Sequence, residues 1–209
     1  LPSMRPTGHV HLLDLGANAE CTAEQLVQFG VMGAAMVSAL EGISQPSVAL
    51  LNIGAEEIKG NEVIRTAARQ LQAMPINYIG YIEGDGIFHA DVDVVVADGF
   101  VGNVALKSSE GVARMLMQFA RDEFTRSAYR KLSALLAKPA LSAMRNRADP
   151  GRYNGASLLG LKGIVIKSHG NANTHAFYCA ILEAMKAVEK QVPQKIKVKL
   201  EQSLMHKFD

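Results

Sequence analysis

The chain has 209 residues, of which 48% are hydrophobic and 20% charged, as in a globular protein with a sizeable core. A net charge of +2 argues against a nucleic-acid partner, and two cysteines far apart, Cys21 and Cys179, indicate reduced thiols in a cytoplasmic setting. We find no run of about 18 uncharged apolar residues, so any membrane contact is expected to be peripheral.

Apolar strands alternate with helical patterns along the chain. Residues 10–13 have the pattern of a strand, and Thr22 with Gln25 has the form of a capping box that begins an apolar helix ending near Gly42. Similar patterns predict strands at 47–53, 77–82, 92–97 and 163–167, and helices at 62–74, 104–124 and 173–190. The repeated strand-then-helix order predicts an α/β fold with a mostly parallel sheet, as a single domain over 1–209.

Residues 121–152 depart from this pattern. They contain eight Arg or Lys and three Asp or Glu, a local charge of +5. An apolar stripe runs along the segment, and Pro139 is expected to interrupt any helix through it. The stripe consists of Leu132, Leu135, Leu136 and Leu141. We predict a basic amphipathic helical hairpin that projects from the domain.

Polar, glycine-containing clusters follow the predicted strands, at 14–18, 52–54, 80–83, 98–103 and 167–170. Ligands of open parallel sheets bind beyond the carboxyl ends of the strands, and glycine lets backbone N–H groups approach a ligand closely. These features predict an anion site. A P-loop, a dinucleotide-binding glycine motif and a GxSxG nucleophile elbow are all absent from the sequence, which argues against those enzyme classes.

Five segments resemble, in order and spacing, the motif blocks of the acyl-ACP:phosphate acyltransferase family, where ACP is acyl carrier protein. They are LLDLGAN (12–18), VALLNIGAEEIKGNE (48–62), INYIGYIEG (76–84), DVVVADGFVGNVALKSSEG (93–111) and YNGASLLGLKGIVIKSHGNAN (153–173). The resemblance implies a three-layer αβα sandwich similar to isocitrate and isopropylmalate dehydrogenases, and a cytoplasmic, membrane-associated homodimer. Members of that family also carry an N-terminal portion, with MGGD-type and SAGNTGA-type segments, that this sequence lacks.

The same resemblance implies conversion of long-chain acyl-ACP and inorganic phosphate to acyl phosphate, an early step of glycerophospholipid synthesis, without a cofactor. Such a site must bind a dianion beside a thioester carbonyl and stabilise an oxyanion. Lys59 is the first catalytic candidate, because an ammonium on a glycine-flanked loop suits phosphate. Asn103 is the second, because its amide can donate to an oxyanion. Their structural alternatives are a solvated loop lysine and a helix N-cap.

Further polar and glycine residues are expected to line the substrate cleft, although turn formation or a structural histidine would explain several of them equally well. They are Asp14, Asn18, Asn61, Glu62, Asp98, Gly99, Gly102, Asn154, Gly155 and His169.

The basic segment has two functional interpretations and one structural alternative. Its cations could dock the acidic ACP, and its leucines could enter an anionic membrane surface. The alternative is packing on a dimer partner. The basic residues considered are Arg126, Arg130, Lys131, Arg145 and Arg147.

Two further clusters carry weaker signals. His9 and His11 would point the same way from a strand, but no third ligand is evident, so no metal site is expected. Cys21 and Cys179 lack a basic or histidine setting in the sequence, so packing is the better interpretation of both thiols.

Other functions remain open on the sequence alone. A short-chain phosphate acetyl- or butyryltransferase that uses acyl-CoA would share the fold and the anion site. A truncated, non-catalytic fragment that dimerises or binds membrane would explain the missing N-terminal portion. A decarboxylating dehydrogenase would need an acidic metal triad, which cannot be assembled from these residues.

Overall fold

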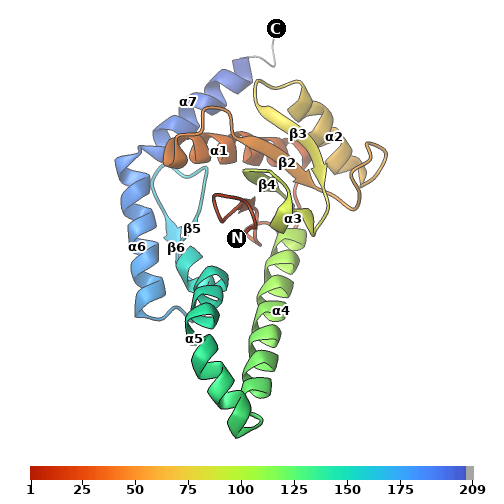
Figure 1. Cartoon of the computed structure of the whole chain (residues 1–209). Coiled ribbons are helices and arrows are strands. Elements are labelled where there is room, and N and C mark those ends of the chain that lie inside the picture. The colour runs from red at the N-terminus through yellow and green to blue at the C-terminus, as the bar shows by residue number, and fades with distance from the viewer. Residues whose placement is uncertain (206–209) are drawn as a thin grey trace.

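A four-stranded parallel sheet forms the centre of the computed structural model, which describes residues 1–205 (Figure 1). Its strands lie in the order β1-β4-β2-β3. Their bounds are β1 (His11–Leu13), β2 (Ser47–Leu51), β3 (Asn77–Ile82) and β4 (Val94–Val96). Val95 lies opposite Leu12 of β1 and Ala49 of β2, which fixes the register at the centre. The predicted α/β class with a parallel sheet is confirmed.

Both faces of the sheet are buried, and successive side chains of β4 alternate between them. Val94 and Val96 pack on one face and Val95 on the other, all fully buried, which explains why the strands read as continuous apolar runs. The first face is covered by α1 (Ala23–Glu41), α2 (Glu62–Gln72) and α7 (Val192–Met205). The second face packs against α3 (Gly86–His89) and the first residues of the chain. This layering is consistent with an αβα sandwich, and the dehydrogenase-type fold name stays a prediction.

Helix α1 begins and ends as the sequence predicts. The Thr22 hydroxyl accepts a hydrogen bond from the Gln25 N–H at 3.3 Å, and the Gln25 side chain accepts one from the Thr22 N–H at 2.8 Å. Gly42 ends the helix at φ 75°, with its N–H donating to the Ser38 carbonyl. Gly33 allows close packing on the sheet, because a Cβ there would lie 2.7 Å from Val94 Cγ1.

Helix α1 bears on the expectation that any membrane contact is peripheral. Within residues 1–205 it is long and apolar enough to cross a membrane by length and composition, with a mean hydropathy of 1.2 over 18 residues, although Glu24 and Glu41 keep it from being an uncharged run. Two thirds of that window is buried inside the protein, so the apolar sequence is accounted for by packing against the sheet.

Helices α4 (Gly99–Thr125) and α5 (Ala128–Ala148) form a long hairpin that projects away from the sheet (Figure 1). α4 begins five residues before the predicted start, because the Asp98 carboxylate caps it by accepting from the Val101 N–H at 2.9 Å. The turn falls at Arg126 and Ser127. The predicted interruption at Pro139 is wrong, since α5 runs through this exposed residue. About three helical turns precede it, and alanine and leucine on both sides favour the helix.

The C-terminal third differs most from the prediction. The strand expected at 163–167 is reduced to β6 (Ile166–Lys167), which pairs antiparallel with β5 (Ala156–Ser157) in a separate two-stranded sheet. A 3-10 turn, η1 (Pro150–Tyr153), precedes this sheet, and α6 (Thr174–Glu189) follows it.

Helix α7 was not predicted. Its signal is the spacing of Val192, Ile196 and Leu200 by four residues, and all three pack against the core. Pro193 obscured that pattern, yet in the first turn of a helix its missing N–H costs nothing.

Candidate functional site

The carboxyl ends of β1, β4 and β2 lie side by side, and the chain leaves them in opposite directions. Helices α1 and α2, which follow β1 and β2, pack on the first face of the sheet, whereas Ala105 of α4, which follows β4, packs on the second. β4 lies between β1 and β2. Reversals of this kind open crevices at the carboxyl edge of a parallel sheet, where ligands bind.

The loop after β1 is organised by the Asp14 carboxylate. One carboxylate oxygen accepts from the N–H groups of Gly16 and Ala17, at 2.9 and 2.7 Å. The other accepts from the backbone and side-chain N–H groups of Asn18, at 3.1 and 2.7 Å. Asp14 is buried and its oxygens are engaged within the loop. This is the turn-stabilising role given above as its alternative, and a contact of Asp14 with substrate stays a prediction.

The first turn of α4 lies directly on this loop. A Cβ on Gly99 would stand 1.8 Å from the Asn18 carbonyl oxygen, and one on Gly102 would stand 1.9 Å from the Asp14 carbonyl oxygen. Both distances are far inside van der Waals contact, so only glycine fits at either position. The glycines that the sequence placed near a ligand therefore bring two segments of backbone together.

Asn103 projects from the same turn. Its side chain lies beside Gly16, where an added Cβ would come within 3.2 Å of Asn103 Cβ, and the residue is exposed. The alternative role of Asn103 as a helix N-cap is wrong, because Asp98 occupies that position. The Asn103 amide is thus presented at the carboxyl edge without a capping function.

The loop after β2 carries Lys59 and is held from both sides. From inside, the buried Asn52 amide donates to the carbonyl oxygens of Gly54 and Lys59, at 3.0 and 3.2 Å. Gly60 adopts φ 88° against it, and a Cβ there would lie 2.3 Å from Asn52 Oδ1. From outside, Arg65 donates to the Gly60 carbonyl at 2.9 Å. Asn52 was given no role of its own above, although its place at the end of a buried strand marks it as a positioning residue.

The Lys59 ammonium is only weakly engaged. Its nearest carboxylate is Glu56, at 4.0 Å, and about half of the side chain is exposed. Its neighbours in the sequence have local partners instead. Asn61 caps α2 by accepting from the Ile64 N–H at 2.9 Å. Ion pairs with Arg65 and Arg69 lower the pKa of Glu62.

Lys59 therefore lies on the loop after β2, and Asn103 lies in the first turn of α4, which follows the neighbouring strand β4. Within residues 1–205, Lys59 contacts its own loop, and Asn103 lies beside Gly16 of the β1 loop. The structure brings together Asp14, Asn18, Asp98, Gly99, Gly102 and Asn103 at the β1 and β4 ends, and Lys59, Asn61 and Glu62 at the β2 end.

The remaining predicted site residues follow the other sheet. Buried Asn154 donates to Ser168 Oγ and the Ala176 carbonyl, at 2.9 and 2.8 Å, and accepts from the His169 N–H at 2.8 Å. Gly155, at φ 113°, packs against α6, with an added Cβ 3.0 Å from Ala180 Cα. These two residues tie β5, β6 and α6 together.

His169 reaches α4 rather than the strand ends. Its ring lies 3.4 Å from Lys107 Nζ and 4.0 Å from Glu110. Lys107 is one helical turn after Asn103, so His169 and Lys107 extend the same helix face away from the sheet. Lys107 is a second ammonium near the edge that sequence reasoning missed. Its signal was the four-residue spacing from Asn103 inside one motif block.

The two thiols differ in their surroundings. Burial raises the pKa of Cys21, and the negative charges of Asp14 and Asp98 add to this against an opposing contact with the Gly99 backbone. Cys21 is thus a poor nucleophile, in agreement with a packing role. Cys179, in contrast, has a histidine beside it, contrary to the expectation, because its sulfur lies 3.9 Å from Nε2 of His175, one turn earlier on α6.

Two hollows lie away from this edge. One, of about 550 Å³, opens at the amino ends of β2 and β3, between α1 and α7. The other, of about 510 Å³, lies between residues 157–166 and α7 and is lined mainly by leucine, isoleucine and valine. The candidate site is thus an open edge formed by loops, not one of these hollows.

Comparison with known proteins agrees with the resemblance noted above. The family described as "Fatty acid synthesis protein" matches residues 1–195. A phosphate acyltransferase of Methylococcus capsulatus is 57% identical over 196 residues, which is 94% of this chain and 57% of that protein. Phosphate acyltransferases of Alkalilimnicola ehrlichii and Halorhodospira halophila are 56% and 54% identical, over 96% and 94% of this chain and 58% of each relative.

The chain therefore spans less than two thirds of the length of these curated relatives. Since the match covers nearly all of its residues, this chain belongs to the fatty acid synthesis protein family.

Proposed function

We propose that this chain provides catalytic loops of a phosphate acyltransferase that converts long-chain acyl-ACP and inorganic phosphate to acyl phosphate and free ACP. This reaction is an early step of glycerophospholipid synthesis. The observation that carries the proposal is the 52–57% identity, over nearly the whole chain, to proteins named phosphate acyltransferase. The placement of Lys59 after β2 and of Asn103 in the first turn of α4 after β4 supports it, because a cation and an amide donor then lie at the same edge of the sheet, with Lys107 one helical turn further along α4.

The chemistry is a direct displacement at a thioester. A phosphate oxygen attacks the carbonyl carbon, the new C–O bond forms, and a tetrahedral oxyanion develops. Collapse of the oxyanion breaks the C–S bond, and the departing ACP thiolate takes the proton of hydrogen phosphate. The site needs to hold the dianion close to the carbonyl and to stabilise the oxyanion. No enzyme nucleophile is required, which agrees with the raised pKa of Cys21.

Lys59 suits the phosphate in this scheme. Its side chain is about half exposed and its ammonium lies 4.0 Å from its nearest carboxylate, so a dianion can bind it without displacing a strong ion pair. Asn52, Gly60 and Arg65 hold the loop that carries it. Asn103 suits the oxyanion, since its amide is free of the capping role and projects from the positive end of a 27-residue helix.

The α4–α5 hairpin is proposed to contact acidic ACP and an anionic membrane surface. Leu132, Leu135 and Leu136 are 57%, 64% and 78% exposed, which supports an apolar contact beyond the chain itself. Arg126 and Arg130 both pair with Glu123, which uses part of their charge. Steering of an acidic partner is therefore assigned first to Lys131, Arg145 and Arg147. A homodimer in the cytoplasm that touches the membrane peripherally completes the proposal.

Turnover by the chain tests the proposal. The chain is incubated with labelled phosphate and either palmitoyl-ACP or acetyl-CoA, and acyl phosphate is measured. We expect acyl phosphate from palmitoyl-ACP, with a large loss of turnover in Lys59→Ala and Asn103→Ala. Lys190→Ala and Asn77→Ala remove the same side chains from exposed positions outside the carboxyl edge and should leave turnover unchanged.

Each other outcome has a meaning. Preference for acetyl-CoA favours the short-chain enzyme, and no turnover by folded chain favours a non-catalytic fragment. Normal turnover in both site variants overturns the assignment of Lys59 and Asn103. The hairpin is tested with Arg145→Glu/Arg147→Glu, which should raise the KM for acyl-ACP. Leu135→Ser/Leu136→Ser should reduce sedimentation with anionic vesicles. An unchanged KM and unchanged sedimentation would remove the hairpin from the proposal.

A further inference from the structure

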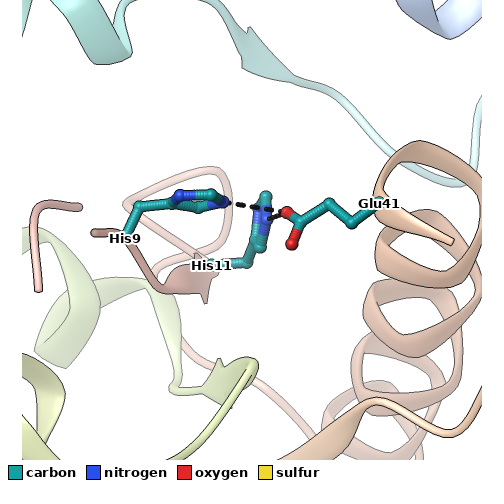
Figure 2. A group of neighbouring side chains, drawn as sticks. All are labelled: His9, His11 and Glu41. Carbon is teal, nitrogen blue, oxygen red and sulfur yellow. Dashed lines mark hydrogen bonds and ion pairs between the residues drawn. The ribbon is translucent and has the colours of Figure 1, made fainter. Parts of the chain in front are cut away.

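A compact cluster of three metal-ligating side chains lies at the opposite edge of the sheet from the candidate site (Figure 2). His9 and His11 come from the amino end of β1, and Glu41 is the last residue of α1. Both Nε2 atoms point to the same Glu41 oxygen, at 2.9 Å from His9 and 2.5 Å from His11. One ligand atom from each residue lies within 4.8 Å of the others.

The fold explains why these residues meet. Residues 9 and 11 are two apart along an extended segment, so their side chains leave the same side. α1 starts at the carboxyl edge of the sheet and runs back across it, which returns its last residue to the amino end of β1. Glu41 is thus the third ligand that the sequence did not reveal.

A backbone hydrogen bond orients one of the two imidazole rings toward the centre of the cluster. His9 Nδ1 lies 3.0 Å from the Thr7 carbonyl oxygen, which can only accept. A backbone carbonyl at Nδ1 orients a metal-binding histidine and leaves the Nε2 lone pair for the ion. Both Nε2 atoms face the same Glu41 carboxylate oxygen, so one divalent cation at the centre of the cluster could be bound by all three groups.

The charge and the spacing also suit a metal. The Glu41 carboxylate supplies an oxygen ligand between two imidazole nitrogens. Tetrahedral zinc holds nitrogen and oxygen ligands at about 2.0–2.2 Å, which places ligand atoms about 3.4 Å apart. The two short contacts therefore need to open by less than about 1 Å. The side chains are 22–32% exposed, which leaves access for the ion and a water molecule.

We propose that His9, His11 and Glu41 bind a zinc ion that ties the start of β1 to the end of α1. Two imidazole nitrogens and one carboxylate form a donor set that zinc accepts readily, with water as the fourth ligand. The site lies at the far end of β1 from Asp14, so its role is separate from the proposed acyl transfer.

The test uses the untagged full chain, freed of metal with a chelator and titrated with zinc chloride against a chromophoric competitor. We expect one zinc ion per chain with a dissociation constant in the micromolar range. His11→Gln and Glu41→Gln should each weaken binding at least about tenfold. His89→Gln is the matched control, because His89 pairs with Asp85 at 3.4 Å without belonging to the three-residue cluster. It should bind zinc as the unchanged chain does.

Two further measurements keep the outcome clear if a variant folds poorly. Cobalt added to the unchanged chain should give the visible absorption of a tetrahedral or five-coordinate site. Zinc at a concentration that just saturates the unchanged chain should raise its unfolding midpoint by more than that of Glu41→Gln. No saturable binding, a cobalt spectrum like that of the free ion, or equal weakening by His89→Gln would overturn the proposal.

Discussion

Substitution of Gly102 by alanine tests the close contact between α4 and the β1 loop. The added Cβ would lie 1.9 Å from the Asp14 carbonyl oxygen, whereas real Cβ contacts essentially never fall below 3.0 Å. One backbone segment therefore has to move by at least 1.1 Å, and neither is a flexible side chain that can turn away. Overpacking costs about 1–3 kcal/mol, and we expect about 3 kcal/mol here because both segments are main chain. For a protein of this size that lowers the thermal midpoint by about 6–12 °C.

Gly111 provides a matched control in the same helix. A Cβ added there meets no atom within 4 Å, so Gly111→Ala should increase the free energy of unfolding by about 0.5–1 kcal/mol. The two variants make the same chemical change with opposite expected signs. Differential scanning calorimetry of both, beside the unchanged chain, measures the difference. A Gly102→Ala midpoint within about 1 °C of the unchanged chain would refute the contact as described.

Three further substitutions test other parts of the fold. Asn154→Ala leaves the Ala176 carbonyl and the His169 N–H without their partner, and should lower the free energy of unfolding in urea by about 2–4 kcal/mol. Burial raises the pKa of Asp93, but hydrogen bonds from Arg5 and Ser47 outweigh it and hold the pKa below its usual value. The ionised Asp93 carboxylate therefore stabilises the folded state fully above the unfolded pKa of about 4, and this stabilisation is lost as the pH falls through the lower pKa of the folded state. Asp93→Asn removes this group, so the free energy of unfolding of the variant should fall less steeply between neutral and acidic pH. Pro139→Ala restores a backbone N–H donor inside α5. It should increase the local stability of α5 by up to about 3 kcal/mol, which is measured as slower amide hydrogen exchange in that helix.

Each of these variants has a neighbour as its control. Asn146→Ala removes an exposed amide and should cost less than about 0.5 kcal/mol. Asp91→Asn changes a carboxylate that is 92% exposed, so the free energy of unfolding of this variant should depend on acidic pH almost as that of the unchanged chain does. Lys138→Ala should leave exchange in α5 close to normal. Equal effects in a variant and its control would contradict the corresponding assignment.

Features set by neighbouring residues were predictable from the sequence. The capping box of Thr22 and Gln25, the αL stop at Gly42 and the buried strands depend on local hydrogen bonds and on runs of apolar residues. Errors arose where two local signals compete. Asp98 and Asn103 are both good N-caps, and the tertiary contact of Gly99 with the β1 loop favours the earlier start of α4.

Features that depend on register between distant segments were not predictable. Gly102 needs to be glycine because of the Asp14 carbonyl, which reaches it only through the pairing of β1 with β4. The meeting of Glu41 with His11 follows from the direction in which α1 crosses the sheet. A sequence pattern shows that a residue is polar or small, and the fold decides what it contacts.

The backbone contact at Gly99 and Gly102 also has a mechanical consequence. With no side chain between them, the β1 loop and the first turn of α4 pack backbone against backbone, so a shift of one displaces the other. α4 extends about 40 Å from that point to the hairpin turn. The hairpin is therefore a long extension that is anchored to the sheet at the Asp14 loop. A displacement of the hairpin turn would therefore be transmitted along α4 to the residues beside Asn103.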